Sequence, residues 1–261
     1  MRIRSILLIL TIALLAGCGG KQERTEEGPT AEELYEDAQR VLTAKNYPGA
    51  IQLYRMLTIQ FPFGRHAEQA LLDMAYAQYK SGQAESAMAT LDRFLRTYPT
   101  HPNVDYAWYL KGLVNYDVTM GFLRTLMPGS VTDRDQEAAH QSFRDFQELV
   151  RRHPDSRYVA DARQRMVFLR NIMAEYEIDV GQYYARRGAH VAALNRARYV
   201  IENYPGAPAS INALELMAES YEKLNMTELA SDTRRVLEYN YADLIDDDKR
   251  QGLLTRLWPF D

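Results

Sequence analysis

A repeated spacing of small residues and proline constrains this 261-residue chain more than any other feature. Proline ends a run of helix-forming residues four times, and a small residue stands twelve positions before each proline. The prolines are Pro62, Pro99, Pro154 and Pro205, and the small residues are Ala50, Ala87, Ser142 and Ala193. A further small residue stands twelve positions upstream again at Ala38, Ala75 and Gly181. Small side chains let two helices approach closely and proline stops the second helix, so the pattern predicts successive helical hairpins.

The spacing matches the tetratricopeptide repeat, a 34-residue helical hairpin. The second unit repeats the first at a distance of 37 residues at all three anchors, and a fifth unit without its proline runs from Ala218 to Ala230. Hairpins of this kind bury a core only by stacking on their neighbours. The sequence therefore predicts an all-α fold, a right-handed solenoid of five tetratricopeptide-like helical hairpins.

Two irregular intervals interrupt the repeat. In the third unit the small residues Gly112 and Ser142 are 30 positions apart, which indicates an insertion of 18 residues. Glycine, proline and serine within it predict a loop over residues 117–135, whose apolar side chains either fold back on the solenoid or contact a partner. In the fourth unit, 14 extra residues before Gly181 equal nearly four helical turns and predict one helix of about 30 residues, beginning at an Asp155-Ser156 cap.

The N-terminus resembles a bacterial lipoprotein signal. Arg2 and Arg4 precede an apolar run of about ten residues, which is too short to span a bilayer, and Leu15-Ala16-Gly17-Cys18 follows. The resemblance implies cleavage before Cys18, acylation of its thiol and amine, and stable membrane anchoring. The alternative, a buried core cysteine, is disfavoured by its polar, glycine-rich flanks. Gly19 stands where an aspartate would imply inner-membrane retention, so the outer membrane is favoured.

The predicted organisation follows from these boundaries. It comprises a lipoprotein signal peptide (1–17), a lipidated flexible tether (18–30), N-terminal repeats 1–3 with the insertion loop (31–154), C-terminal repeats 4–5 (155–242), and a C-terminal tail (243–261). Thr30 and Glu33 predict a capping box at the start of the first helix.

Composition argues against several classes of function. The formal charge is -4, which does not favour nucleic-acid binding, and the single cysteine excludes an intramolecular disulfide and a cysteine metal cluster. The five histidines form no His-x-x-x-His pair, and no hydrolase elbow motif is present. The acidic run 246–248 lacks the spacing of a calcium loop and is interpreted as a solvated charge run. We therefore expect a protein that is not an enzyme and binds no metal or cofactor.

Aromatic residues supply the first set of candidate binding residues. Most of the 18 tyrosines stand near repeat-consensus positions, where packing is the ordinary role. The other interpretation is that some line a concave groove, where amphipathic rings suit an extended peptide. The candidates for substrate binding are Tyr35, Phe63, Tyr76, Tyr79, Tyr106 and Tyr109.

Arginines supply the second set. Residues 151–198 hold ten arginines against five acids, whereas residues 215–248 hold ten acids against three cations. Such asymmetry is usual for solvated helix faces, but four arginines gather around one predicted turn and are candidates for docking an acidic partner surface. They are Arg186, Arg187, Arg196 and Arg198, with Arg196 the first choice.

Several connecting segments resemble one known family. These are Phe61-Pro62-Phe63-Gly64, residues 99–106 (Pro-Thr-His-Pro-Asn-Val-Asp-Tyr), Thr132-Asp133-Arg134-Asp135, Pro154-Asp155-Ser156-Arg157-Tyr158, and the stretch from Tyr183-Tyr184 to Arg187-Gly188-Ala189. With the lipoprotein signal and the repeats, they resemble the BamD family of lipoproteins from the outer-membrane β-barrel assembly machinery. The resemblance covers nearly the whole chain except residues 253–261.

The resemblance implies a function. It implies a non-catalytic, periplasm-facing scaffold whose C-terminal repeats dock the polypeptide-transport-associated domains of BamA. It also implies that the N-terminal repeats contact unfolded β-barrel substrates and another lipoprotein of the assembly complex. The alternative is a repeat lipoprotein that serves another envelope machine, in pilus secretin assembly or cell-wall coordination, because the same anchor and solenoid would suffice.

Overall fold

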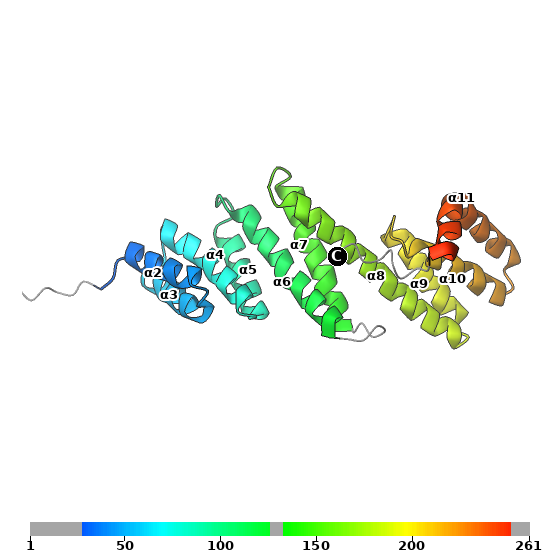
Figure 1. Ribbon diagram of the computed structural model, residues 1–261, viewed down its shortest axis with the longest axis horizontal. Coiled ribbons are helices and arrows are strands. Elements are labelled where there is room, and N and C mark those ends of the chain that lie inside the picture. Colours follow the sequence, from blue (N-terminus) through cyan, green and yellow to red (C-terminus); the bar gives the residue numbers. More distant parts are fainter. Residues whose placement is uncertain (1–27, 126–132, 252–261) are drawn as a thin grey trace, which may run out of the picture. The chain divides into compact units, whose positions relative to one another are not determined.

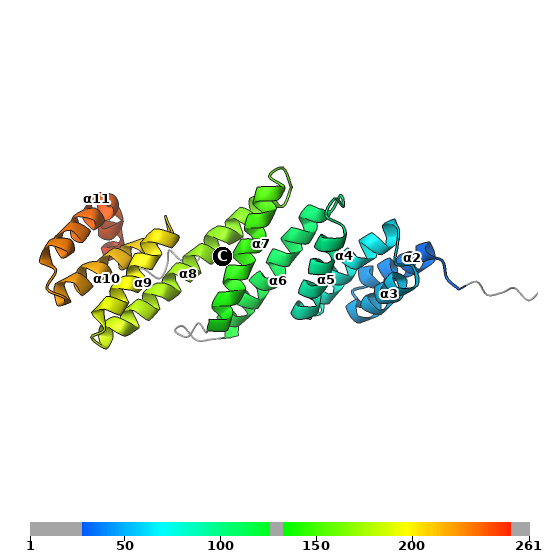
Figure 2. The same cartoon turned by 180° about the vertical axis from the view of Figure 1, so that it is seen from behind.

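The computed structural model describes residues 28–125 and 133–251, with side chains for residues 28–121 and 136–242. Within these ranges the regular structure consists of ten α-helices that follow one another in pairs, as Figures 1 and 2 show. The helices are α2 (Ala31–Thr43), α3 (Tyr47–Gln60), α4 (Arg65–Lys80), α5 (Ala84–Thr97), α6 (Val104–Thr125), α7 (Asp133–Arg152), α8 (Val159–Arg186), α9 (His190–Asn203), α10 (Ser210–Lys223) and α11 (Thr227–Gln251). The predicted all-α fold of five helical hairpins is confirmed.

The chain divides into two compact units, residues 1–70 and 71–261. The first unit contains α2, α3 and the beginning of α4. Thr30 and Glu33 form the predicted capping box, in which each side chain accepts a hydrogen bond from the other residue's backbone N–H. Asn46 caps α3, whose second residue is Pro48, and the core between the two helices contains the fully buried Tyr54 and Leu57. Local capping chemistry therefore starts both helices where the sequence predicts.

In the second unit the helices form an inner and an outer layer. Each helix from α5 to α11 contacts the next one along the chain, and α8 also contacts α6 and α10 directly. These three are the first helices of their hairpins, so the first helices lie against one another and make the inner layer. The second helices α7 and α9 each contact the first helices on both sides of them in sequence, and we call them the outer layer.

Small residues permit the close approach within each hairpin, as the spacing predicts. Ala75, Ala87, Ser142 and Ala193 have no exposed surface. A Cβ built on Gly112 of α6 would lie 2.5 Å from the ring of the buried Phe146 on α7, far inside normal contact distance. Only glycine fits at this crossing.

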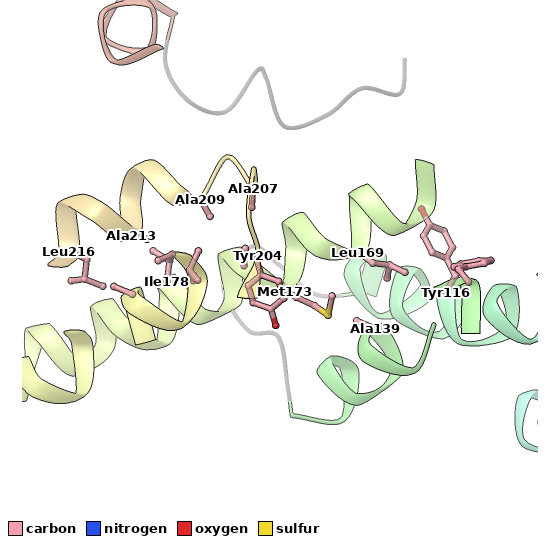
Figure 3. Packing of buried hydrophobic residues seen from close by; sticks show 14 of the residues in the cluster. Tyr116, Ala139, Leu169, Met173, Ile178, Tyr204, Ala207, Ala209, Ala213 and Leu216 are labelled. Atoms are coloured by element: carbon pink, nitrogen blue, oxygen red, sulfur yellow. The ribbon is translucent and has the colours of Figure 1, made fainter. Parts of the chain in front are cut away.

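One hydrophobic cluster runs from α6 to α10. Figure 3 shows Tyr116 near Leu169 at one end, Met173 beside Tyr204 in the middle, and Ile178 with Ala213 and Leu216 at the other end. Long α8 supplies a residue to each of these three positions. It is 28 residues long, close to the 30 predicted, so the extra turns bridge the third and fourth hairpins.

The predicted insertion loop is wrong over most of its length. Helix α6 continues through Gly121 to Thr125, and α7 begins at Asp133, so only residues 126–132 of the predicted loop 117–135 lie outside the described residues. Gly121 costs a helix only about 1 kcal/mol relative to alanine, and the buried Thr119 keeps this turn packed. The extended α6 and α7 form one wall of a groove of about 760 Å³ beside the start of α5.

Two further boundaries differ from the prediction. Helix α8 begins at Val159, after Tyr158, and Ser156 does not cap it but donates a hydrogen bond of 2.6 Å to Asp105 of α6. Helix α11 continues through the predicted end of the repeats at residue 242 to Gln251. The predicted signal peptide and most of the tether (1–27), and the end of the tail (252–261), lie outside the described residues.

The last helix differs from the other second helices at three positions that recur after the small anchor. One, four and eight residues after the small anchor, the second helices of the first four hairpins carry apolar residues or threonine, buried or half-buried. The equivalent residues of α11, Ser231, Arg234 and Glu238, are polar and exposed, and Arg234 pairs with Glu222 of α10. A polar outer face is typical of the terminal repeat of a solenoid. The sets of three are Ile51, Tyr54 and Thr58; Met88, Leu91 and Leu95; Phe143, Phe146 and Val150; and Leu194, Ala197 and Ile201.

Candidate functional site

Six tyrosines, buried or half-buried, follow one another along the inner layer of the second unit. We call them the tyrosine ladder. They come from α4, α6 and the start of α8, and are Tyr76, Tyr79, Tyr106, Tyr109, Tyr116 and Tyr158.

The ladder is continuous between α6 and α8. The ring of Tyr158 stacks on that of Tyr109, with centroids 4.7 Å apart and planes 16° apart, and its centroid lies 5.5 Å from that of Tyr106. The Tyr109 hydroxyl donates a 2.7 Å hydrogen bond to Asp161 of α8. Arg165 donates to the same carboxylate oxygen at 2.6 Å. Rings and hydroxyls are therefore held in fixed positions.

The ladder extends from α6 toward α4. The Tyr79 hydroxyl donates a short hydrogen bond to Asp117 of α6. Tyr76 lies close enough to Tyr106 to contribute to its raised pKa, whose main cause is burial. Burial followed by the Asp117 hydrogen bond likewise raises the pKa of Tyr79. These phenols stay protonated and neutral at any physiological pH.

Arg165 is the cation at the centre of this face. Its guanidinium lies 4.6 Å from the ring centroid of Tyr116, within cation–π distance, and it also pairs with Asp161. Burial and then the hydrogen bond to Asp161 raise the pKa of Tyr109 to about 12. The arrangement presents neutral aromatic rings, and the hydroxyls of Tyr79, Tyr109 and Tyr158 have hydrogen-bond partners. Such a surface suits the apolar and aromatic side chains of an extended polypeptide.

Four of the six predicted aromatic candidates are therefore brought together: Tyr76, Tyr79, Tyr106 and Tyr109. The sequence analysis did not select Tyr116, Tyr158, Asp161 or Arg165. Their position could have indicated them. Each lies on the first helix of a hairpin or directly before one, as the four selected tyrosines do.

The other two aromatic candidates lie in the first unit and do not contact each other. Tyr35 packs inward, with its ring centroid 6.2 Å from that of Tyr54 and 5.3 Å from that of His66, and its hydroxyl accepts a hydrogen bond from Gln39. Phe63 follows α3 and is 90% exposed. Tyr35 is thus largely a packing residue, whereas the Phe63 ring is available to a partner.

The four arginine candidates lie on two successive helices, Arg186 and Arg187 at the end of α8 and Arg196 and Arg198 on α9. Arg186, at the end of α8, lines a cavity of about 230 Å³ against α10, and the guanidinium of Arg187 lies 4.5 Å from the ring centroid of Tyr183. Arg196 and Arg198 lie on α9, where two positions correspond to about 200° of rotation, so they point in different directions.

Arg196 already has a partner inside the protein. Its Nη1 lies 2.8 Å from Oε2 of Glu177 on α8, whose side chain is only 11% exposed, while that of Arg196 is 43% exposed. The arginine neutralises a buried carboxylate and still presents part of its guanidinium to solvent. Arg198 is more exposed and lies 3.7 Å from Glu202, the separation typical of a surface pair.

The inner layer becomes acidic toward the C-terminus. Glu175 and Asp179 lie one turn apart on α8, and burial raises the pKa of both carboxyls. Glu215 and Glu219 of α10 line the same cavity as Arg186. The sequence analysis counted these acids by segment but did not place them on the inner layer.

The described residues were also compared with the requirements of a metal site and of a membrane-spanning helix. Among the described residues, no group of three or more histidine, cysteine, aspartate or glutamate side chains is placed to hold a metal ion. None of the described helices is both long and apolar enough to cross a bilayer. Cys18, the predicted lipidation site, lies outside the described residues.

Comparison with known proteins assigns the family. Residues 28–237 match the family model YfiO, described as an outer membrane lipoprotein. A protein of Xylella fastidiosa named outer membrane protein assembly factor BamD is 40% identical over 238 residues, which are 91% of this chain and 81% of that protein. The chain belongs to the BamD (YfiO) family. The BamD resemblance predicted from the connecting segments is therefore confirmed.

Other BamD relatives agree over similar lengths. The BamD protein of Neisseria meningitidis serogroup B is 41% identical over 91% of this chain and 89% of its own length. That of Vibrio cholerae is 33% identical over 92% of this chain and 99% of its own. Among solved structures, a thermophilic TPR protein from Thermus thermophilus aligns over 85% of this chain and 96% of its own, with a TM-score of 0.39 and 13% identity. A structural likeness this loose carries no inference about function.

Proposed function

We propose that this chain is an outer membrane protein assembly factor, a non-catalytic scaffold that binds unfolded β-barrel proteins on its tyrosine ladder and holds them near the assembly machinery. The family membership and the names of its relatives support the assembly role. The ladder supports the binding role, because the rings of Tyr106, Tyr109 and Tyr158 pack into one aromatic surface, beside which Asp161 and Arg165 pair with each other.

The chemistry of the ladder explains how one surface accepts many different chains. A nascent β-barrel strand alternates apolar and polar side chains, so one face of it can rest on aromatic rings. The hydroxyls of Tyr79 and Tyr109 are occupied by Asp117 and Asp161, so binding does not require a matching polar pattern from the ligand. Recognition through stacking and apolar contact tolerates sequence variation, as an assembly factor requires.

Docking to the machinery is assigned to the C-terminal hairpins. Arg186, Arg187 and Arg198 are exposed, and Arg196 is partly exposed, so they can contact an acidic surface of the periplasmic domains of BamA. We propose that they contribute to the rim of an interface. Other lipoproteins of the complex are further expected partners.

The anchor in this proposal is Cys18. Acylation there and the tether up to residue 30 would hold the helical hairpins on the periplasmic face of the outer membrane, where the machinery works. The expected experiment is mass spectrometry of the mature N-terminus, which should find cleavage before Cys18 and acyl chains on it.

Photo-crosslinking tests the ladder directly. A crosslinking amino acid at Tyr76 or Tyr106 should capture unfolded outer-membrane proteins in cells, and the same group at Tyr199, on α9 of the outer layer, should not. Capture from Tyr199 as efficient as from Tyr76 would contradict the assignment of the binding face.

Affinity purification from membranes tests the partner. A tag at the C-terminus should recover BamA in stoichiometric amount. Recovery of a secretin without BamA would assign the chain to a different envelope machine and overturn the proposal.

A further inference from the structure

The outer surface of α3 carries an exposed apolar patch in the first unit. It consists of Met56, Ile59 and Phe63, which are 43%, 72% and 90% exposed. We call it the α3 patch. The opposite side of α3 is also apolar, since Ile51, Tyr54 and Leu57 are buried in the hairpin. A helix that is apolar on both sides needs a second apolar environment.

The second helices of the other hairpins differ at the positions equivalent to Met56 and Ile59. At the positions that Met56 and Ile59 occupy relative to the small anchor of α3, α5 carries Arg93 and Arg96, and α7 carries Glu148 and Arg151. Helix α9 carries the exposed Tyr199 and Glu202 there. Helix α11 carries Val236 and Tyr239, near acids and arginines that include the Asp232–Arg235 ion pair. The first and last hairpins thus expose apolar residues at both positions, but only α11 has acidic residues among its neighbours in sequence.

The surroundings of the α3 patch are cationic. Residues 38–67 contain no aspartate or glutamate, in a chain whose formal charge is -4. They include Lys45, Arg55 and Arg65, besides Arg40, which pairs with Asp37. Arg55 lies on the exposed side of α3 and Arg65 follows Phe63 by two residues, and both are exposed. Neither has an ion-pair partner among the described residues. Apolar side chains flanked by cations are typical of a surface that binds anionic lipid.

The connectivity places this patch near the membrane anchor. In an antiparallel helical hairpin, the end of α3 lies beside the start of α2, so Phe63, which follows α3, is at the same end of the first hairpin as Ala31. The thirteen residues 18–30 can span at most about 45 Å when fully extended. An acylated Cys18 therefore keeps the α3 patch within reach of the bilayer surface.

We propose that the α3 patch is a second membrane contact, which inserts Ile59 and Phe63 into the headgroup region of an anionic phospholipid bilayer while Arg55 and Arg65 pair with lipid phosphates. This inference rests on the membrane anchor in the proposed function. The acyl chains fix the point of attachment, and the patch fixes which face of the first hairpin meets the bilayer.

A labelled cysteine tests the contact in the mature chain. Cys18 is the only cysteine, so Cys18→Ser with Phe63→Cys gives one labelling site in an unacylated protein. An environment-sensitive fluorophore at residue 63 should shift to the blue and brighten with vesicles of phosphatidylethanolamine and phosphatidylglycerol, but not with phosphatidylcholine alone. The matched control is Tyr239→Cys on α11, also an exposed ring position, which should not respond.

Substitutions then separate the two contributions to binding. In the unacylated chain, Ile59→Ser should lower the partition coefficient about tenfold or more. Arg55→Gln should lower it about fivefold with anionic vesicles only. Ile59 and Arg55 are both exposed, so these substitutions should leave the circular dichroism spectrum and the unfolding midpoint unchanged. The control Val236→Ser should leave the partition coefficient unchanged.

The outcomes distinguish this inference from the alternatives. No response at residue 63, or an equal response at residue 239, would overturn it. A response at residue 63 to an unfolded outer-membrane protein segment but not to vesicles would assign the patch to protein binding and overturn it as well. The vesicle assay contains only this chain and lipid, so its result does not depend on whether the chain co-purifies with BamA.

Discussion

The contact between Gly112 and Phe146 allows a sharp test of the packing that holds the third hairpin. We expect Gly112→Ala to destabilise the protein although alanine is the better helix former. The new methyl carbon would lie 2.5 Å from two ring carbons of Phe146 and 2.8 Å from a third. Carbon atoms pack favourably at about 3.5–4.0 Å, so the overlap is about 1 Å.

The structure offers no inexpensive way to relieve this overlap. Phe146 has no exposed surface, and Ser142 of α7 donates a 2.9 Å hydrogen bond to the Gly112 carbonyl, which holds the two helices at their present distance. Overpacking of a core costs about 1–3 kcal/mol, occasionally more, and the gain in helix propensity is about 1 kcal/mol. Because the Phe146 ring is rigid, we expect an overpacking cost at the upper end of that range, about 3 kcal/mol. Subtracting the gain in helix propensity leaves a net loss of stability of about 2 kcal/mol. For a domain of this size it lowers Tm by about 4–8 °C.

Urea unfolding followed by circular dichroism measures the effect. Gly121→Ala on the same helix is the matched control, because no described atom lies within 4 Å of the added carbon. It should stabilise the protein by about 0.5–1 kcal/mol. In a Phe146→Leu background, Gly112→Ala should cost much less than in the parent, as a double-mutant cycle would show. A Gly112→Ala protein as stable as the parent would refute the close-packing explanation.

Three further predictions concern charged and titrating groups. Arg196→Glu should destabilise the protein by about 1–3 kcal/mol in urea unfolding, because it leaves Glu177 buried beside a like charge. Adding Glu177→Gln to this variant should restore most of the lost stability, and no recovery would show that the pair is not the cause. Burial, followed by a nearby arginine, lowers the pKa of His140, so an NMR titration should find it below the ordinary 6.5. The folded state then binds fewer protons at His140, and its contribution to stability is lost as pH falls below about 6.5; a pKa at or above this value would contradict the burial. The pKa of Tyr109 is about 12, and Asp161→Asn should lower it in an ultraviolet titration read against Tyr109→Phe, whereas an unchanged value would leave burial as its only cause.

The five hairpins could be predicted from sequence because each depends on a local steric requirement. Ala87 and Ala193 must be small where two helices cross, and Pro99 and Pro205 must end the second helix, so the requirement leaves a fixed spacing. The length of α8 followed from the same reasoning, because whole helical turns preserve the face that Gly181 presents. Such features are encoded within one hairpin.

Sequence patterns were insufficient where the outcome depends on the environment of a residue. Gly121 was interpreted as a loop residue, yet an exposed helix tolerates one glycine at small cost, so α6 continues past it. The four arginines were grouped by their proximity in sequence. The structure pairs Arg196 with Glu177, nineteen residues away on another helix, and sequence spacing gave no indication of this partner.

The tyrosine ladder shows an intermediate case. Its individual members could be selected, since first helices of stacked hairpins line a common face. The carboxylates that hold them, Asp117 and Asp161, come from the next hairpin in each case. Whether these hydrogen bonds form depends on the rotation of one hairpin relative to the next. The repeat spacing alone does not determine that rotation.

The polar residues of α11 determine how separate copies of the chain behave toward one another. Stacked helical hairpins can in principle continue from one molecule to the next, and an open head-to-tail contact of this kind produces filaments. At the terminal surface, such a contact would bury Arg234 and Glu238 against another chain without replacing the water they now contact. A head-to-tail contact through this face of α11 would therefore have to remove Ser231, Arg234 and Glu238 from solvent, which disfavours it.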